Sequence, residues 1–181
     1  LRTSLKGRSR RQLFSLEGRK EAAVLVPLIQ GAQGMEVLFT LRTDSVPTHK
    51  GQVAFPGGGV EPDDPDSVAA ALREAEEEIG LPPSAVDILG LGDDVFSING
   101  LKVTPVVGFI HQLPELRGNP GEIADIFTVT LDRLMRPEAY YETDMAAPNG
   151  VRHQVPFFEG GKHQIWGLTA WILKELLTVM R

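Results

Sequence analysis

The sequence contains no cysteine among its 181 residues. A disulfide framework, a thiolate nucleophile and a zinc–thiolate cluster are therefore excluded, and a reducing compartment is compatible with the composition. The sequence also lacks any run of about 18 consecutive apolar residues, which a membrane-spanning helix requires, and its N-terminal residues have no apolar centre typical of a signal peptide. We expect a soluble, cytoplasmic protein with no membrane partner.

Positive charge is in short supply as well, because 18 Lys and Arg face 24 Asp and Glu, for a formal net charge of −6 at pH 7. A nucleic acid polymer usually requires a basic partner surface, so the balance argues against one. The first 20 residues are the exception, with seven basic residues and one acid. We predict a basic N-terminal arm over 1–21 and one domain over 22–181. The arm is expected to be a solvated terminus, with an anion-contacting arm or a targeting tail as alternatives.

Several site motifs are absent too. The sequence has no GxxxxGK[ST] phosphate loop, no HExxH and no GxSxG, which argues against a P-loop enzyme, a zinc protease of that type and an α/β-hydrolase. The four histidines show no metal-ligand spacing, and ordinary polar or core roles suit them better.

The chain does contain clear helix and strand patterns. Apolar residues over 22–29 predict a buried strand, in which Pro27 favours an edge or a bulge, and alternation over 36–42 predicts a second strand paired to the first as a hairpin. Gly, Pro and Asp over 43–65 predict a long loop. A helix over 66–79 is expected, with Asp66 or Ser67 as its N-cap and Gly80 as its stop. Further strands are predicted at 86–92, 103–110, 123–129 and 154–158, a short helix at 131–135 and a closing helix at 164–180.

The predicted helix over 66–79 has an acidic face. Glu74, Glu77 and Glu78 stand at i, i+3 and i+4, turned away from the apolar stripe, so their carboxylates crowd together and repel one another. Mg²⁺ or Mn²⁺ would remove the conflict, because both ions prefer hard oxygen ligands. Alone, such a patch is more often a solvated face. The glycines of residues 55–59 change that interpretation, because a backbone without side chains can closely approach a metal or phosphate.

Taken together, GGGVEPDD and REAEEEIGL resemble the Nudix box. The second half matches at each fixed place, namely Arg73, Glu74, Ala75, Glu77, Glu78, Gly80 and Leu81. The first half departs from the pattern, since the expected Glu falls at Asp64 and eight residues rather than seven separate it from Arg73. This longer spacing resembles the coenzyme A branch of the family.

An upstream signature of the coenzyme A branch is matched in register by Leu38, Thr40, Arg42, Gly51, Phe55, Pro56, Gly57 and Gly58. Phe39 and Thr43 replace two expected residues, and Pro47 stands where a second Arg is expected, for which Lys50 or His49 would be the substitute. Residues 119–122 resemble a later acidic site of the family, and 165–173 its closing helix. The likeness extends from about residue 22 to the end of the sequence.

The resemblance implies a fold of the α/β (α+β) class, with a mixed β-sheet sandwiched between helices. It implies that Mg²⁺ or Mn²⁺ is bound by Glu74, Glu77, Glu78, Glu122 and the Gly57 carbonyl. Glu77, Glu78, Glu122 and Arg73 would form the catalytic set, although the resemblance does not choose the general base. Arg42, Lys50, Gly51, Phe55 and Gly58 would contact the substrate, with ordinary surface cations as the alternative for Arg42 and Lys50.

The implied reaction is hydrolysis of the diphosphate linkage of coenzyme A and its derivatives, giving 4′-phosphopantetheine and adenosine 3′,5′-bisphosphate. The alternatives are a related activity on ADP-ribose, dinucleotides or damaged nucleoside triphosphates, and a nucleotide sensor that does not cut its ligand. Retention of Glu74, Glu77 and Glu78 argues against the sensor. The sequence does not indicate the oligomeric state.

Overall fold

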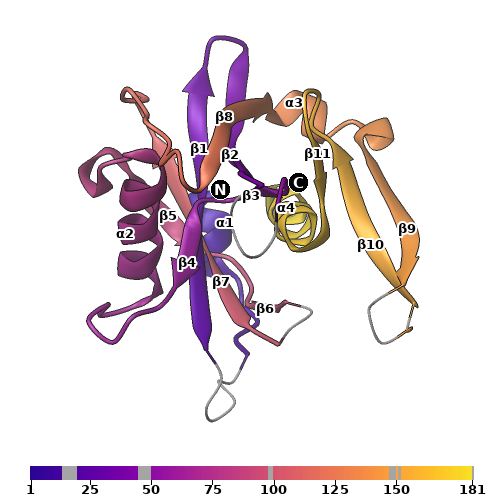
Figure 1. Ribbon diagram of the computed structural model, residues 1–181, viewed down its shortest axis with the longest axis horizontal. Helices are drawn as coiled ribbons and strands as arrows, with labels where there is room; N and C mark the ends of the chain where they lie inside the picture. Colours follow the sequence, from indigo (N-terminus) through magenta and orange to yellow (C-terminus); the bar gives the residue numbers. More distant parts are fainter. Residues whose placement is uncertain (14–19, 45–49, 98–99, 147–149, 151, 181) are drawn as a thin grey trace.

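The structure is a computed structural model, and it describes residues 1–13, 20–44, 50–97, 100–146, 150 and 152–180. Its central feature is a mixed sheet (Figure 1). The main path of this sheet runs β3 (Val53–Ala54), β2 (Gly34–Arg42), β1 (Glu21–Gly31), β7 (Lys102–Ile110) and β5 (Asp87–Leu91). Off this path, β4 (Gly57–Gly59) pairs with β1, β6 (Val95–Phe96) with β7, and β8 (Ile123–Thr130) with β2. The β1–β7 pair is parallel and the others are antiparallel.

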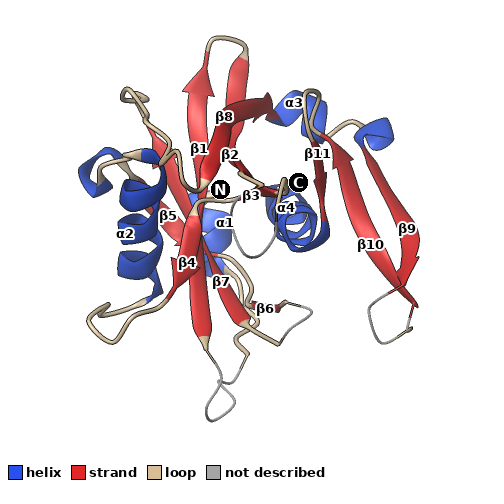
Figure 2. Cartoon of the chain, viewed as in Figure 1, coloured by secondary structure: helices blue, strands red, loops and turns tan. Residues whose placement is uncertain are grey.

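Helices cover both faces of this sheet, as the resemblance implied. Helix α2 (Ser67–Ile79) lies on one face, and α4 (Gly167–Met180) with the short α1 (Arg2–Gly7) lies on the other (Figure 2). Beyond α4 stands a small sheet of order β11 (Gln164–Trp166), β10 (Arg152–Glu159) and β9 (Tyr140–Ala146). Short turns of helix occur at α3 (Leu131–Leu134), η1 (Pro83–Ala85) and η2 (Pro137–Ala139). None of the helices in the described segments is long and apolar enough to cross a membrane.

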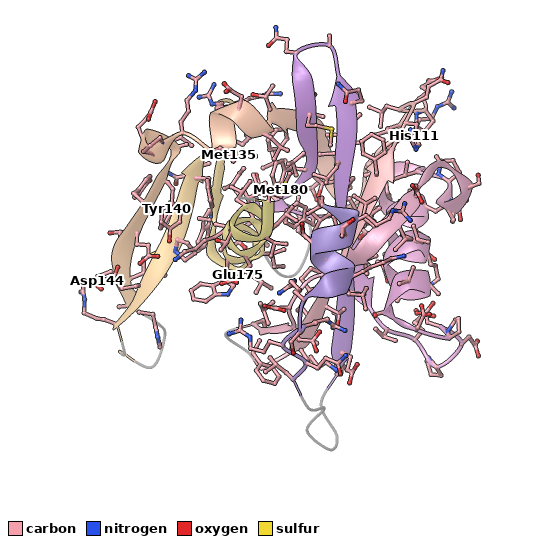
Figure 3. All side chains as sticks on the ribbon, turned by 180° about the vertical axis from the view of Figure 1, so that it is seen from behind. His111, Met135, Tyr140, Asp144, Glu175 and Met180 are labelled. Carbon is pink, nitrogen blue, oxygen red and sulfur yellow. The ribbon has the colours of Figure 1, made fainter. Side chains whose placement is uncertain are left out.

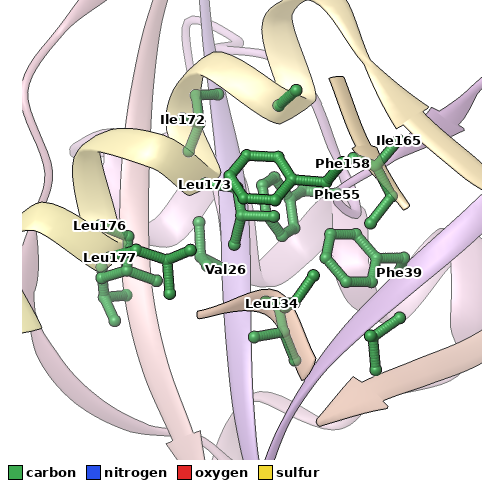
Figure 4. Packing of buried hydrophobic residues seen from close by; sticks show 14 of the residues in the cluster. Val26, Phe39, Phe55, Leu134, Phe158, Ile165, Ile172, Leu173, Leu176 and Leu177 are labelled. Atoms are coloured by element: carbon green, nitrogen blue, oxygen red, sulfur yellow. The ribbon is translucent and has the colours of Figure 1, made fainter. Parts of the chain in front are cut away.

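Strand β1 supplies side chains to both layers of the core, because successive side chains of a strand point to opposite faces. Val26 and Leu28 join the cluster that packs against Leu173 of α4 (Figure 4). Leu25 and Ile29 join the cluster on the α2 side. The continuously apolar sequence of this strand is thus explained by burial on both faces.

Most predicted elements are confirmed, including the β1–β2 hairpin, α2 with its Asp66 cap, and strands β5, β7, β8 and β10. Two element boundaries differ from the prediction. Residues 164–166 form β11 instead of the start of the closing helix, because Gly167 at φ 65° turns the chain before α4 begins. Within the predicted loop 43–65, two short strands, β3 and β4, join the sheet.

Pro27 lies in an interior strand, and not at the edge or bulge that was expected. The amide of Leu25 donates to the Pro56 carbonyl at 2.8 Å, so the next amide facing that edge would belong to Pro27. Pairing with β4 ends at Val24 and pairing with β2 begins at Leu28. The residue without an amide hydrogen therefore occupies the gap between two partner strands, where no ladder hydrogen bond is lost.

The described part of the basic arm, residues 1–13, packs against the rest of the chain. Leu5 of α1 is buried in the α4-side cluster. The arm's arginines form ion pairs with a row of acids on and after β5, namely Arg2 with Asp87, Arg8 with Asp93 and Arg10 with Asp94. This arrangement differs from a solvated terminus, because Leu5 is buried and three arginines are paired with these acids.

Candidate active site

The rotational setting of α2 positions the acidic face. Asp66 caps the helix, since its Oδ1 accepts a hydrogen bond from the Ala69 amide at 2.9 Å. Ala71, Ala75 and Ile79 are buried against β1. With that stripe fixed, the remaining face is directed toward the glycine strand β4 and the solvent at its rim.

Glu78 is the most buried acid of this face, with only 4% of its surface exposed. Its Oε2 accepts a hydrogen bond from the Gly57 amide at 3.1 Å, and its Oε1 lies 3.3 Å from Nη1 of Arg42. Burial raises the pKa of the Glu78 carboxyl to about 7, although the Gly57 amide and Arg42 act in the opposite direction. Burial disfavours the ionised form of Glu78, and the hydrogen bonds from Gly57 and Arg42 partly offset that effect.

Glu74 and Glu77 have different environments. The Glu74 carboxylate lies against Gly58, where an added Cβ would stand 2.5 Å from its carboxyl carbon, and burial raises its pKa. The Glu77 side chain is 61% exposed and faces solvent one turn away. Arg73 contacts both carboxylates, at 2.9 Å from Glu74 and 3.4 Å from Glu77, the second being an i, i+4 pair.

Arg73 is itself held by Asp64. The guanidinium donates from Nε to Oδ1 at 3.1 Å and from Nη2 to Oδ2 at 2.9 Å, and Nη2 also donates to the Gly59 carbonyl. These charge-assisted bonds hold the pKa of Asp64 below its usual value. In the sequence, the spacing between Asp64 and Arg73 is one residue longer than the pattern has it. The structure shows that it meets Arg73 in spite of that spacing.

Glu122 reaches this face through the loop 117–122. The amides of Arg117 and Asn119 donate to the Ile79 and Glu78 carbonyls at 2.9 and 2.7 Å, so the loop caps the carboxyl end of α2. The Asn119 side-chain amide donates to Glu122 Oε1 at 3.2 Å. Glu122 acts electrostatically on both Glu74 and Glu78, raising the pKa of each.

The residues predicted to contact substrate differ in their surroundings. Arg42 stands beside Glu78, and Gly58 lies under Glu74. Phe55 is buried and stacks on Phe39 with ring centroids 5.0 Å apart. Lys50 is exposed, and Gly51 occupies a turn at φ 62°. Pro47 and His49 are outside the described residues.

The donor chemistry of the acidic face fits a divalent cation. In the described segments, no three His, Asp or Glu side chains form a metal-ligating group. Oxygens of Glu74 and Glu78 accept hydrogen bonds from Arg73, Arg42 and the Gly57 amide. Burial is the main cause that raises the pKa of Glu74 and Glu78, and repulsion from neighbouring acids, Glu122 among them, adds to it. Neighbouring carboxylate oxygens are the hard ligands that Mg²⁺ or Mn²⁺ would bind.

Comparison with known proteins gives consistent matches. The NUDIX domain family matches residues 19–148. Proteins named "Uncharacterized Nudix hydrolase NudL" are 40% identical to this chain in Escherichia coli K12, over 87% of this chain and 81% of that protein, and 40% identical in Photorhabdus laumondii, over 88% and 84%. Among solved structures, a MutT/nudix family protein from Enterococcus faecalis has a TM-score of 0.60 at 17% identity, covering 93% of this chain and 64% of that one. An Ap4A hydrolase from C. elegans has a TM-score of 0.54 at 21% identity, covering 62% and 81%.

Proposed function

Because the chain belongs to the Nudix hydrolase family, we propose that it hydrolyses the diphosphate linkage of coenzyme A and its derivatives. The products would be 4′-phosphopantetheine and adenosine 3′,5′-bisphosphate. Water adds across the linkage, so that its oxygen bonds to one phosphorus while the bridging P–O bond to that phosphorus breaks. The proton released by the water passes to a carboxylate of the acidic face.

The observation that supports this substrate best is the position of Arg42. It ends β2 at the place that the coenzyme A signature assigns to an arginine, and its Nη1 lies 3.3 Å from Glu78. Its Nε is buried and has no hydrogen-bond partner among the residues that the structure describes. A buried donor without a partner costs free energy, and arginine binds phosphate oxygens well because its donors form a planar fork. A phosphate of the substrate would supply the missing acceptor.

The other residues of the site have roles that follow from their contacts. Glu74, Glu77, Glu78, Glu122 and the Gly57 carbonyl would hold Mg²⁺ or Mn²⁺. Such a cation lowers the pKa of a bound water and offsets negative charge on diphosphate oxygens. Arg73 orients Glu74 and Glu77, and Asp64 fixes Arg73. Gly58 gives the Glu74 carboxylate room to lie close to the main chain.

A substrate panel tests the proposal. The purified protein is incubated with coenzyme A, ADP-ribose, NADH and nucleoside triphosphates in the presence of Mg²⁺ or Mn²⁺, and the products are separated and identified by mass. We expect the highest kcat/KM for coenzyme A. Faster turnover of ADP-ribose, a dinucleotide or a nucleoside triphosphate would show that coenzyme A is not the preferred substrate. Tight binding of a nucleotide without turnover would indicate a sensor.

Substitution of Glu78 tests the catalytic set. Glu78→Gln keeps the shape of the side chain but removes its charge, so turnover should fall by at least about 100-fold while the protein stays folded. Glu76→Gln is the matched control, because Glu76 is an exposed acid of the same helix. Unchanged turnover in the Glu78 variant, or an equal loss in both variants, would contradict the assignment.

A further inference from the structure

Asn119 connects the two acids that come from different parts of the chain. Its main-chain amide donates to the Glu78 carbonyl at 2.7 Å, which attaches the loop to the last turn of α2. Its side-chain Nδ2 donates to Glu122 Oε1 at 3.2 Å. A single residue thus contacts the main chain of one acid and the carboxylate of the other.

The same residue also shapes the turn that carries Glu122. Its Oδ1 accepts a hydrogen bond from the Gly121 amide at 3.1 Å, which closes an Asx-type turn, and its carbonyl accepts from the Glu122 and Ile123 amides at 2.9 and 2.8 Å. These bonds fix the main chain on both sides of Gly121. The Glu122 carboxylate is therefore directed by a turn that is already rigid.

On the other side, the loop is attached to the end of β2. The Thr43 amide donates to the Glu122 carbonyl at 2.8 Å, and the Thr43 hydroxyl donates to the Gly121 carbonyl at 3.1 Å. Thr43 directly follows Arg42, which contacts Glu78. The loop therefore bridges α2 and β2, and the Asn119 side chain is the part of this bridge that contacts the Glu122 carboxylate itself.

We propose that Asn119 is a positioning residue that orients the Glu122 carboxylate relative to Glu78, so that both acids serve one cation. This inference rests on the proposed metal-dependent hydrolysis. Groups that orient metal ligands typically change metal affinity or activity by about 10–100-fold when they are removed. The Asn119 amide acts only through Glu122, so its effect should vanish when Glu122 can no longer ligate.

A double-mutant cycle tests this role. Asn119→Ala removes both side-chain bonds, while Asn119→Ser keeps an oxygen that can close the turn but is too short to reach Glu122. Mn²⁺ affinity is measured by electron paramagnetic resonance on the full chain without substrate, in wild type, in both variants, in Glu122→Gln and in the two double variants. We expect each Asn119 variant to weaken Mn²⁺ binding by about 10–100-fold alone, and by less than about 2-fold in the Glu122→Gln background.

Activity and stability provide further readouts. On the substrate that the panel identifies, kcat should fall with KM little changed, and Asn119→Ser should unfold within a few degrees of wild type. Gln154→Ala is the control, because Gln154 is an exposed amide that donates to Asp144 on the small sheet. Wild-type Mn²⁺ affinity in Asn119→Ser, or the same loss in both backgrounds, would overturn the proposal. If coenzyme A is not hydrolysed, the substrate assignment fails, yet the Mn²⁺ cycle still decides the role of Asn119.

Discussion

At the scale of single residues, the acidic face depends on the missing side chain of Gly57 as much as on the carboxylates themselves. The Gly57 amide donates to buried Glu78 while its main chain pairs with Val24 of β1. A Cβ at this position would stand 2.4 Å from the Ala23 carbonyl oxygen, which is far inside van der Waals contact. Only glycine allows β4 to approach β1 this closely and still present its amide to the carboxylate.

Gly57→Ala should therefore destabilise the protein by about 1–3 kcal/mol and reduce turnover, because the strand must move away from β1 and its amide away from Glu78. Gly59→Ala provides a close control, since a Cβ at Gly59 meets nothing within 4 Å. Chemical denaturation and steady-state kinetics measure the two effects. Equal stability of the two variants would show that β4 can shift without cost.

The sequence predicted the acids at this scale better than their partners. The spacing of Glu74, Glu77 and Glu78 is visible in the sequence because a helix brings i, i+3 and i+4 together. The bond between Asp64 and Arg73 depends on the path of the loop between them, which spacing alone does not define. The contact of Arg42 with Glu78 is a long-range contact that local patterns cannot reveal.

At the scale of elements, α2 is the part that carries the acidic face, and its two ends are fixed by different means. Asp66 caps the first turn, while Gly80 adopts φ 68° and its amide donates to the Glu76 carbonyl. The loop 117–122 completes the carboxyl end with two further amide donors. The helix is therefore held in register against β4 at both ends.

Removal of the N-cap should lower the unfolding temperature of the protein but leave its turnover rate unchanged. Asp66→Ala is expected to cost about 1 kcal/mol, because the Ala69 amide loses its acceptor. A domain of this size should then unfold roughly 2–4 °C lower. Ser67→Ala is the control, because Ser67 is the neighbouring residue that the sequence offered as an alternative cap. Thermal unfolding that ranks the two variants in the opposite order would assign the cap to Ser67.

The sequence predicted the elements whose apolar residues repeat with a clear period, and it missed elements in which that repeat is weak. The buried strands β1 and β7 and the helix α2 were evident because their apolar residues repeat with a clear period or run continuously. Strand β9 was missed because charged Glu142 and Asp144 interrupt its apolar pattern. Its place depends on pairing with β10 and on a 2.8 Å ion pair between Glu142 and Lys174 of α4. Figure 3 shows Tyr140 and Asp144 on this small sheet beside α4.

At the scale of the whole molecule, one sheet carries two hydrophobic layers, and the acidic face of α2 is on the side of only one of them. The α2 layer includes Ala75 and Ile79 next to the acidic face. The α4 layer contains Leu5 and joins the N-terminal arm to the core. The arm and the small sheet therefore enlarge the layer remote from the acids, and they support the site through the central sheet.

The ion pairs of the arm should make stability depend on pH in a defined way. Although burial acts to raise the pKa of Asp93, hydrogen bonds from Arg8 and the Arg11 amide lower it overall, below the ordinary value of 3.8. Stability from this carboxylate is therefore fully present above about pH 3.8 and is lost as the pH falls through the lowered pKa of the folded state. Asp93→Asn should cost about 1 kcal/mol at pH 6 and progressively less toward pH 3.

Thermal unfolding of wild type and variant at several pH values tests this expectation. Asp132→Asn is the comparison, because Asp132 forms an exposed i, i+4 pair with Arg136 that should contribute little at any pH. A deficit of the Asp93 variant that stays constant from pH 6 to pH 3 would be inconsistent with an ionised Asp93 in the docked arm.

The three glycines of β4 have an implication for how this protein tolerates genetic change. The hydrogen bond from Gly57 to Glu78 is donated by a main-chain amide. Of all replacements at Gly57, only proline would remove this donor, because proline has no amide hydrogen. An amino-acid replacement there can displace the donor but leaves it in the chain. Random mutation should therefore inactivate this position mainly through crowding, and because the nearest atoms are the Ala23 carbonyl oxygen and the Val24 Cα, a smaller side chain in β1 would not make room.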